Sequence, residues 1–385
     1  MSSDLNDAAP SRGEVSTLYV AVEVSDKSWV VGIGDPQDPG KVSMHTLPPA
    51  DAEGLVAKIG KACDRAGDPP RVLLTYEAGY EGFWLARRLG GREDRRIDVV
   101  MCDPAGLEVV RRAKAAKTDR IDAKRMIRAL AAWDRGETAA LSRVRIPTVE
   151  EEDAKRLMRR RERLVRDRTR IGNTILGLLK LQGVTDLHPR SRDFEERFGD
   201  LHTAFGEPLP AGLRREIEGL REQLAAVERQ LLEVEEEKRS RVGPAPGAPD
   251  SAERRLVRLK GIGPNDAVLL ASEVFYRDFR NRRELAAWAG LAPVPWASGG
   301  VSHGQGISKA GNPTVRKHLI QMAWRWVRWQ PDSEIARWFR GYCAARDGRS
   351  SKRGIVAVAR KLLIALWRYA TCGLVPSGAR LQPSA

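Results

Sequence analysis

The sequence predicts a mixed α/β domain, then a helical middle with a coiled-coil seam, then a mostly α-helical C-terminal domain. Short Val- and Leu-rich runs alternate with amphipathic stretches near the N-terminus, which favours a sheet covered by helices. A long basic and heptad-patterned region follows, and a Pro- and Gly-rich linker precedes the last part. The 385 residues suffice for two or three domains with buried cores.

The N-terminal domain contains strand and helix patterns in a defined order. Two strands are expected within 17–35, interrupted near 25–28, followed by a strand at 41–47 and a helix at 52–65. Strand and helix patterns then alternate at 71–79, 81–90, 97–103 and 106–114. This order fits a mixed sheet with helices on its faces. The RNase H-like (RuvC-like) fold has the same order, although the order alone does not single it out.

Two helical patterns dominate the middle region. Residues 155–170 carry nine basic side chains in sixteen, which favours contact with nucleic acid over a merely solvated face. The second pattern keeps an apolar heptad seam over three heptads, at Leu213, Ile217, Leu220, Leu224, Val227, Leu231 and Val234. This seam fits dimerisation and intramolecular packing against the first helix equally well.

Changes in composition divide the chain. We expect disordered ends at 1–15 and 375–385. Between them we place the α/β domain at 16–145, the Arg-rich and coiled-coil region at 146–241, the linker at 242–252 and the C-terminal domain at 253–374. The Trp-rich run at 324–329 is interpreted as helix packing rather than base stacking.

The formal net charge of +15 is concentrated toward the C-terminus. Residues 1–100 have a net charge of −4, whereas 251–385 have a net charge of +15. This excess favours a polyanionic partner over a neutral metabolite. Four scattered cysteines and five dispersed histidines predict neither a zinc site nor disulfides. Without a signal-peptide pattern or an apolar run of membrane-spanning length, we expect a cytoplasmic, nucleoid-associated protein with no membrane contact.

Four acidic residues lie where a metal-dependent phosphodiester-cleaving site needs them. Glu23 lies in an otherwise apolar strand, where a charge is costly unless it is paired or bound to metal. Glu77 ends a later strand, and Asp119 and Asp122 share one face of a helix start. Converging carboxylates suit Mg²⁺, a hard cation that prefers oxygen ligands. The alternatives are an outward-facing Glu23 and an ordinary salt-bridged helix start.

Three segments resemble the motifs of the DEDD transposases typified by insertion sequence 110, a family that includes the Piv-type invertases. They are YVAVEVSDKSW, YEAGYEGFWLARRL and AKTDRIDAKR, of which KTDRIDA is the most specific. The resemblance implies an RNase H-like catalytic domain in which Glu23, Glu77, Asp119 and Asp122 hold Mg²⁺. The first acid is Glu where the family has Asp, and Asp26 would replace it in another strand register.

The C-terminal region extends the resemblance. A GLAP segment, a Ser-Gly pair and SKAGNPTVR follow one another in the family's order. In that family the serine of the pair is a nucleophile, so the resemblance assigns this role to Ser298, with Ser302 and Ser308 as alternatives. Gly299 and Gly300 would let the backbone approach a DNA phosphate closely. The resemblance implies a DNA transposase or site-specific recombinase that exchanges strands through a transient phosphoserine.

The same resemblance implies the partners. Family members act on target and donor DNA with a structured bridge RNA, as a dimer or tetramer. We assign nucleic-acid binding to the cations near the predicted sites, namely Lys117, Arg120, Lys124, Arg156, Arg159, Arg160, Arg163, Lys309, Arg316 and Lys317. The alternatives are a Piv-like invertase without RNA, a nuclease or resolvase that uses water, and an inactive nucleic-acid-binding relic.

Overall fold

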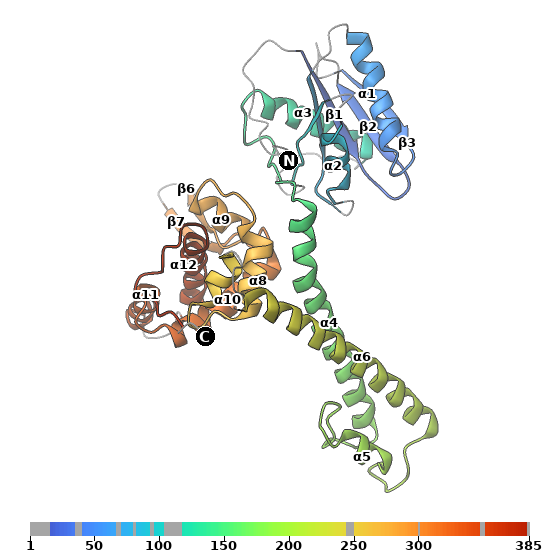
Figure 1. Ribbon diagram of the computed structural model, residues 1–385, viewed down its shortest axis with the longest axis vertical. Coiled ribbons are helices and arrows are strands. Elements are labelled where there is room, and N and C mark those ends of the chain that lie inside the picture. The colour runs from blue at the N-terminus through green and yellow to red at the C-terminus, as the bar shows by residue number, and fades with distance from the viewer. Residues whose placement is uncertain are drawn as a thin grey trace. The chain divides into compact units, whose positions relative to one another are not determined.

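The structure is a computed structural model (Figure 1). It describes residues 16–34, 41–66, 71–79, 82–92, 96–103, 118–243, 250–298, 301–346 and 351–382. The chain forms two compact units, Met1–Thr148 and Val149–Ala385, and each is described by itself. Among the described helices, none is both long enough and apolar enough to cross a lipid bilayer.

A five-stranded mixed sheet forms the centre of the first unit, with the order β3–β2–β1–β4–β5. Its strands are β1 (Thr17–Glu23), β2 (Trp29–Gly34), β3 (Val42–Leu47), β4 (Arg71–Tyr76) and β5 (Ile97–Val99). β1 pairs antiparallel with β2 and parallel with β4, while β2 is antiparallel to β3 and β4 is parallel to β5. The mixed α/β sheet expected from the sequence is therefore present.

Helices cover both faces of this sheet. They are α1 (Ala52–Ala66), α2 (Trp84–Gly90) and α3 (Asp119–Asp134). Because side chains alternate along a strand, Leu18 and Val20 of β1 join the core beneath α1 and α2, whereas Tyr19 and Ala21 join the core beneath α3. The helix expected at 106–114 lies outside the described residues.

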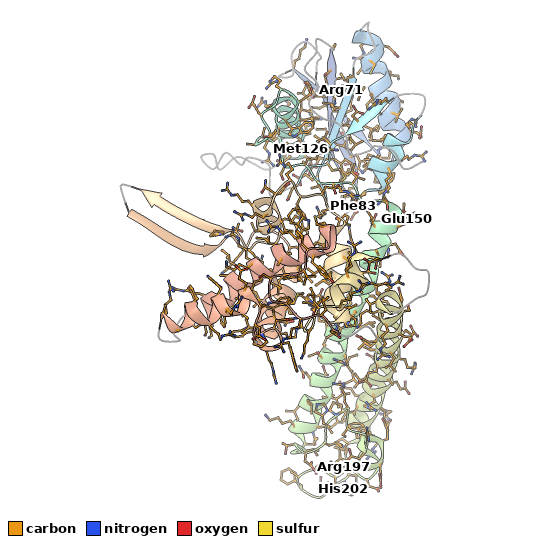
Figure 2. All side chains as sticks on the ribbon, turned by 60° about the vertical axis from the view of Figure 1, so that its left-hand side comes forward. Arg71, Phe83, Met126, Glu150, Arg197 and His202 are labelled. Atoms are coloured by element: carbon orange, nitrogen blue, oxygen red, sulfur yellow. The ribbon has the colours of Figure 1, made fainter. Side chains whose placement is uncertain are left out.

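The second unit begins with a long helical hairpin. It consists of α4 (Val149–Leu181), the short α5 (Phe194–Gly199) and α6 (Ala211–Val242), and Arg197 and His202 mark its far end in Figure 2. Ile217 and Leu224 of the heptad seam are buried in one core with Ile171 and Ile175 of α4. The seam is thus covered by intramolecular packing, which accounts for its apolar pattern without a second chain.

The C-terminal part of the second unit is mostly helical. Its elements are α7 (Ala252–Val257), α8 (Pro264–Leu270), the π-helix η2 (Ala271–Phe275), α9 (Arg282–Trp288), β6 (Pro293–Ser298), β7 (Val301–Ile307), α10 (Pro313–Trp329), α11 (Glu334–Ala344) and α12 (Ser351–Cys372). In the Trp-rich run, Trp326 is fully buried and donates its Nε1–H to Ser333 Oγ at 3.0 Å. Helix packing is therefore confirmed for Trp326, whereas Trp324 and Trp329 are partly exposed.

The C-terminal segment differs from its sequence-based description as a disordered tail. Residues 375–382 lie along the helical core, where the N–H of Arg380 donates to Gln330 Oε1 at 2.7 Å. The amide of the buried Gln330 donates in turn to the carbonyls of Lys260 and Arg380, both at 2.8 Å. The prediction of disorder was therefore wrong for 375–382. Pro, Gly and Ser disfavour a helix in this segment, but hydrogen bonds to the buried Gln330 hold it in an ordered, non-helical conformation.

An asymmetric ion pair joins α8 to α10. Asp266 is 1% exposed, and Nη2 of Arg325 donates to its two carboxylate oxygens at 2.8 and 2.7 Å, while the Arg325 side chain is 44% exposed. Removing the arginine leaves a buried charge without its partner, whereas removing the aspartate leaves a guanidinium that water reaches. The two deletions should therefore differ in their effect on stability.

We expect Arg325→Ala to lower the free energy of unfolding by about 3–5 kcal/mol and Asp266→Ala by only about 1–3 kcal/mol. Urea unfolding of the two variants measures the difference. Arg328→Ala, at an exposed position of the same helix, is the matched control and should change stability by less than about 0.5 kcal/mol. An equal or reversed order of the two partners would show that the ion pair is not asymmetric.

Candidate functional site

Glu23 and Glu77 lie side by side at the ends of two parallel strands. Val22 of β1 and Tyr76 of β4 are register partners, so the residues that follow them occupy neighbouring positions. A parallel bridge from Glu77 to Cys102 continues the sheet at this edge. Strand alternation directs both glutamates to the face that α3 covers, and both residues are half-buried.

Helix α3 runs antiparallel to these two strands. Its last residue, Asp134, accepts a hydrogen bond from Arg71 Nη1 at 3.0 Å, and Arg71 is the first residue of β4. Asp134 also accepts from the hydroxyl of Tyr19 near the start of β1 at 3.0 Å, and burial together with this carboxylate raises the pKa of Tyr19 to about 12. A helix of 16 residues is about 24 Å long and a strand of 6 residues about 20 Å. The first turn of α3 therefore lies at the edge that carries the two glutamates.

That first turn holds Asp119 and Asp122. The helix is capped by Thr118, whose hydroxyl accepts from the Ile121 N–H at 3.4 Å. Asp119 is exposed, whereas the Asp122 side chain is only 9% exposed. Oδ1 of Asp122 forms an ion pair with Nη2 of Arg125 at 3.2 Å, as the salt-bridge interpretation requires. Oδ2 is buried and has no hydrogen-bond partner among the described residues, which that interpretation leaves unexplained.

The four acids share one edge and one face of the sheet, but their side chains do not form a finished metal site. Among the described residues, no three His, Cys, Asp or Glu side chains are arranged to hold one ion. A buried carboxylate oxygen without a donor is costly, and a cation would satisfy it. The oxygen donors of this edge fit Mg²⁺, provided that the side chains of Glu23, Glu77 and Asp119 turn toward Asp122.

Ser298 is the last residue of β6, far along the chain from these acids. It pairs with Val301 of β7, while Pro293 and Ile307 pair at the other end of the two strands. Ile307 packs against the C-terminal core, so Ser298 occupies the tip of a two-stranded ribbon that projects from the helices (Figure 2). The neighbouring Gly299 and Gly300 lie outside the described residues.

The alternative serines occupy other positions on this ribbon. Ser302 pairs with Ala297 on the opposite strand, one step back from the tip. Ser308 lies at the base, where its N–H donates to the carbonyl of Ala292 at 2.9 Å. Of the three serines, Ser298 is thus nearest to the tip.

The base of the ribbon is fixed by two glycines of the motif segments. Gly290 and Gly311 have φ angles of 66° and 107°, which other residues rarely adopt. A Cβ atom at Gly311 would lie 2.1 Å from the carbonyl oxygen of Trp288. Arg316 also binds here, since its Nη1 donates to the carbonyl of Lys309 at 2.9 Å. These motif residues therefore hold the loops that carry the ribbon.

The cations assigned to nucleic-acid binding differ in their surroundings. On α4, Arg156 pairs with Asp153, Arg159 with Glu273 and Arg160 with Glu233, at 3.3, 2.8 and 2.9 Å. Arg120, Lys124, Arg163, Lys309 and Lys317 are exposed and have no ion pair among the described residues, while Lys117 lies outside the described residues. Much of the positive charge of α4 is thus neutralised within the chain, which the local count of arginines could not reveal.

A cavity of about 320 Å³ brings two of these cations together. It is lined by Arg159 and Lys317, and also by Arg161 and His318, which sequence reasoning did not single out. Burial lowers the pKa of His318, so the imidazole is neutral near pH 7. The helical spacing in the sequence could have predicted the position of Arg161, because residues 158, 161, 162 and 165 share the face of α4 that lines this cavity.

Comparisons with known proteins place the chain among transposases. A model of the "Transposase IS116/IS110/IS902 family" matches residues 253–336, which include the ribbon and its anchoring glycines. The y4rJ protein of Sinorhizobium fredii, whose name describes it as a transposase, is 40% identical over 383 residues, covering 96% of each chain. The transposase for insertion sequence element IS1111A of Coxiella burnetii is 29% identical over 262 residues, covering 67% of this chain and 68% of that one.

Proposed function

The chain belongs to the IS116/IS110/IS902 family of transposases, and from this we propose that it exchanges DNA strands by means of a serine nucleophile and a Mg²⁺-binding carboxylate edge. Membership of the family implies DNA binding and DNA transposition. The proposal concerns the chemistry by which this chain carries them out.

The strongest support for a Mg²⁺ site at the four acidic residues comes from Asp122. Asp122 has a buried oxygen without a hydrogen-bond partner in the described part of the chain, at the sheet edge where Glu23 and Glu77 end neighbouring strands. A salt bridge to Arg125 through Oδ1 does not explain why the second carboxylate oxygen is buried without a hydrogen-bond partner. A cation held jointly by these acids and Asp119 accounts for it.

We also propose that the first unit is an RNase H-like domain. The strand order β3–β2–β1–β4–β5, antiparallel in its first three strands and parallel thereafter, supports this assignment. The positions of Glu23 at the end of β1 and Glu77 after β4 support it further. In such a domain the acids act together at one edge of the sheet.

Ser298 would supply the nucleophile. Its Oγ forms a bond to the scissile phosphorus, the bond from phosphorus to the deoxyribose oxygen breaks, and that oxygen leaves as a hydroxyl. The serine proton passes to solvent, and solvent supplies the proton that the leaving oxygen takes up. A hydroxyl of another DNA strand then attacks the phosphorus of the phosphoserine. A new bond from phosphorus to that deoxyribose oxygen forms, the bond to Ser298 Oγ breaks, and the serine is released. The carboxylates would hold Mg²⁺, which when bound stabilises negative charge on the phosphate oxygens.

We further propose that a structured RNA guides the choice of target and donor DNA and that the active form is a dimer or tetramer. The net charge of +15 supports a polyanionic partner, and the resemblance of the motif segments to guided recombinases supports RNA as one such partner. The protein would then need no long base-reading surface of its own.

The proposal is tested with protein co-expressed with the DNA that flanks its gene. We expect strand transfer between donor and target DNA in Mg²⁺, and none after EDTA or after treatment of the protein with ribonuclease. Transfer that survives EDTA would contradict the carboxylate site. Transfer that survives ribonuclease would contradict RNA guidance and favour an invertase-like mode. Cleavage without any protein-linked DNA end would favour a nuclease that uses water.

A further inference from the structure

A large groove lies on the C-terminal part of the second unit. It has a volume of about 880 Å³ and is formed by α9, α11, α12 and the segment 374–377. Five cations line it, namely Arg282, Arg283, Arg360, Lys361 and Arg368. Glu334 is the one acidic side chain among the lining residues that the structure describes. The groove therefore carries a strong local excess of positive charge.

These five cations have no ion pair within the described residues, whereas several arginines of α4 have one. On α4, Arg159, Arg160 and Arg161 each bind a glutamate at 2.9 Å or less. Unpaired cations gathered in one groove repel one another, and an anionic ligand relieves that repulsion. The groove thus gathers five cations that no described acidic side chain pairs with.

Apolar and aromatic surface accompanies the charge. Trp338 of α11 lines the groove and stacks on Tyr342 with ring centroids 5.3 Å apart. Lys361 Nζ lies 4.7 Å from the centre of the Trp338 ring, so a cation and an aromatic ring are presented together. Leu374, which also lines the groove, is 61% exposed. This combination suits a ligand with both phosphates and unstacked bases.

We propose that this groove binds a single-stranded DNA segment. A duplex presents its phosphates outward and hides its bases, so it would leave the apolar floor uncovered. A single strand places phosphates on the arginines and bases against the apolar side chains that line the groove, namely Ile335, Ile364 and Leu374. DNA is the strand that transposition itself supplies, because strand exchange releases single-stranded ends. The inference rests on the family membership and not on the roles of Ser298 or the carboxylates.

The test compares two double variants in binding to a fluorescent 12-nucleotide single-stranded DNA of mixed sequence, in EDTA. Arg360→Gln with Arg368→Gln removes two groove cations. Arg337→Gln with Arg353→Gln removes two exposed cations, one of α11 and one of α12, that do not line the groove. Each single-strand phosphate contact contributes a slope of about 0.7 in log affinity against log salt. We expect the groove variant to bind about 25-fold more weakly at about 0.1 M salt, with a slope smaller by about 1.4.

The control variant should bind within about twofold of the native chain. Equal losses in both variants would overturn the groove assignment, and so would unchanged binding by the groove variant. The same DNA as a duplex and an RNA of the same sequence serve as further arms. If the groove variant lost affinity only for the duplex or only for the RNA, the assignment of the groove to single-stranded DNA would be overturned. Because the experiment measures binding alone, a failure here leaves the serine and carboxylate proposals untouched, and their failure leaves this one standing.

Discussion

Replacing Asp122 with asparagine is expected to reduce DNA strand transfer by about a thousandfold while the first unit stays folded. The substitution keeps the shape of the side chain but removes the charge that would hold a cation. Oδ2 has no hydrogen-bond partner to lose in the described structure, and Arg125, the partner of Oδ1, is 37% exposed and can be solvated. Stability should therefore change by less than about 1 kcal/mol. Transfer rates and thermal unfolding of the same preparation measure the two effects.

Asp134→Asn is the matched control at the other end of α3. Asp134 accepts hydrogen bonds from Arg71 and Tyr19, so its replacement should lower the free energy of unfolding by about 1–3 kcal/mol. Strand transfer per folded molecule should be unchanged. If Asp122→Asn instead unfolded the unit and spared the activity of the folded fraction, Asp122 would be a structural residue.

Ser298→Ala is expected to abolish the covalent protein–DNA adduct, with a fall of about 10⁴-fold or more in strand transfer. No cation of the second unit is changed, so DNA binding should stay within about twofold of the native chain. The adduct is detected as a DNA-dependent shift of the denatured protein, and binding is measured separately in EDTA.

Ser302→Ala and Ser308→Ala are the matched controls for this prediction. They remove a hydroxyl from the same ribbon, one step from the tip and at the base, and both variants should retain the adduct. An adduct that persists in Ser298→Ala and disappears in Ser302→Ala would move the nucleophile to the opposite strand of the ribbon.

Local patterns predicted the elements that hold the site. The period of two in YVAVE determines which residues of β1 face each core, and it predicts that Glu23 lies in a strand. The i, i+3 spacing of Asp119 and Asp122 likewise places both on the first turn of α3. These features depend on neighbours in the chain, so the sequence contains them directly.

Features that depend on distant contacts were not predictable in this way. The direction of α3 is fixed by the contact of Asp134 with Arg71, 63 residues away. The neutralisation of Arg159 depends on Glu273, 114 residues away. The order of the C-terminal segment depends on Gln330, 50 residues from its partner Arg380. Long-range pairs of this kind decide which cations are free to bind a ligand, and local composition does not record them.

The attachment site of the DNA tests the central proposal most directly. The native chain is incubated with donor DNA in Mg²⁺, the adduct is digested with protease and nuclease, and the nucleotide-bearing peptide is identified by mass spectrometry. We predict a nucleotide linked through a phosphodiester to Ser298. A nucleotide on any other residue, or strand transfer without a linked peptide, would contradict the account.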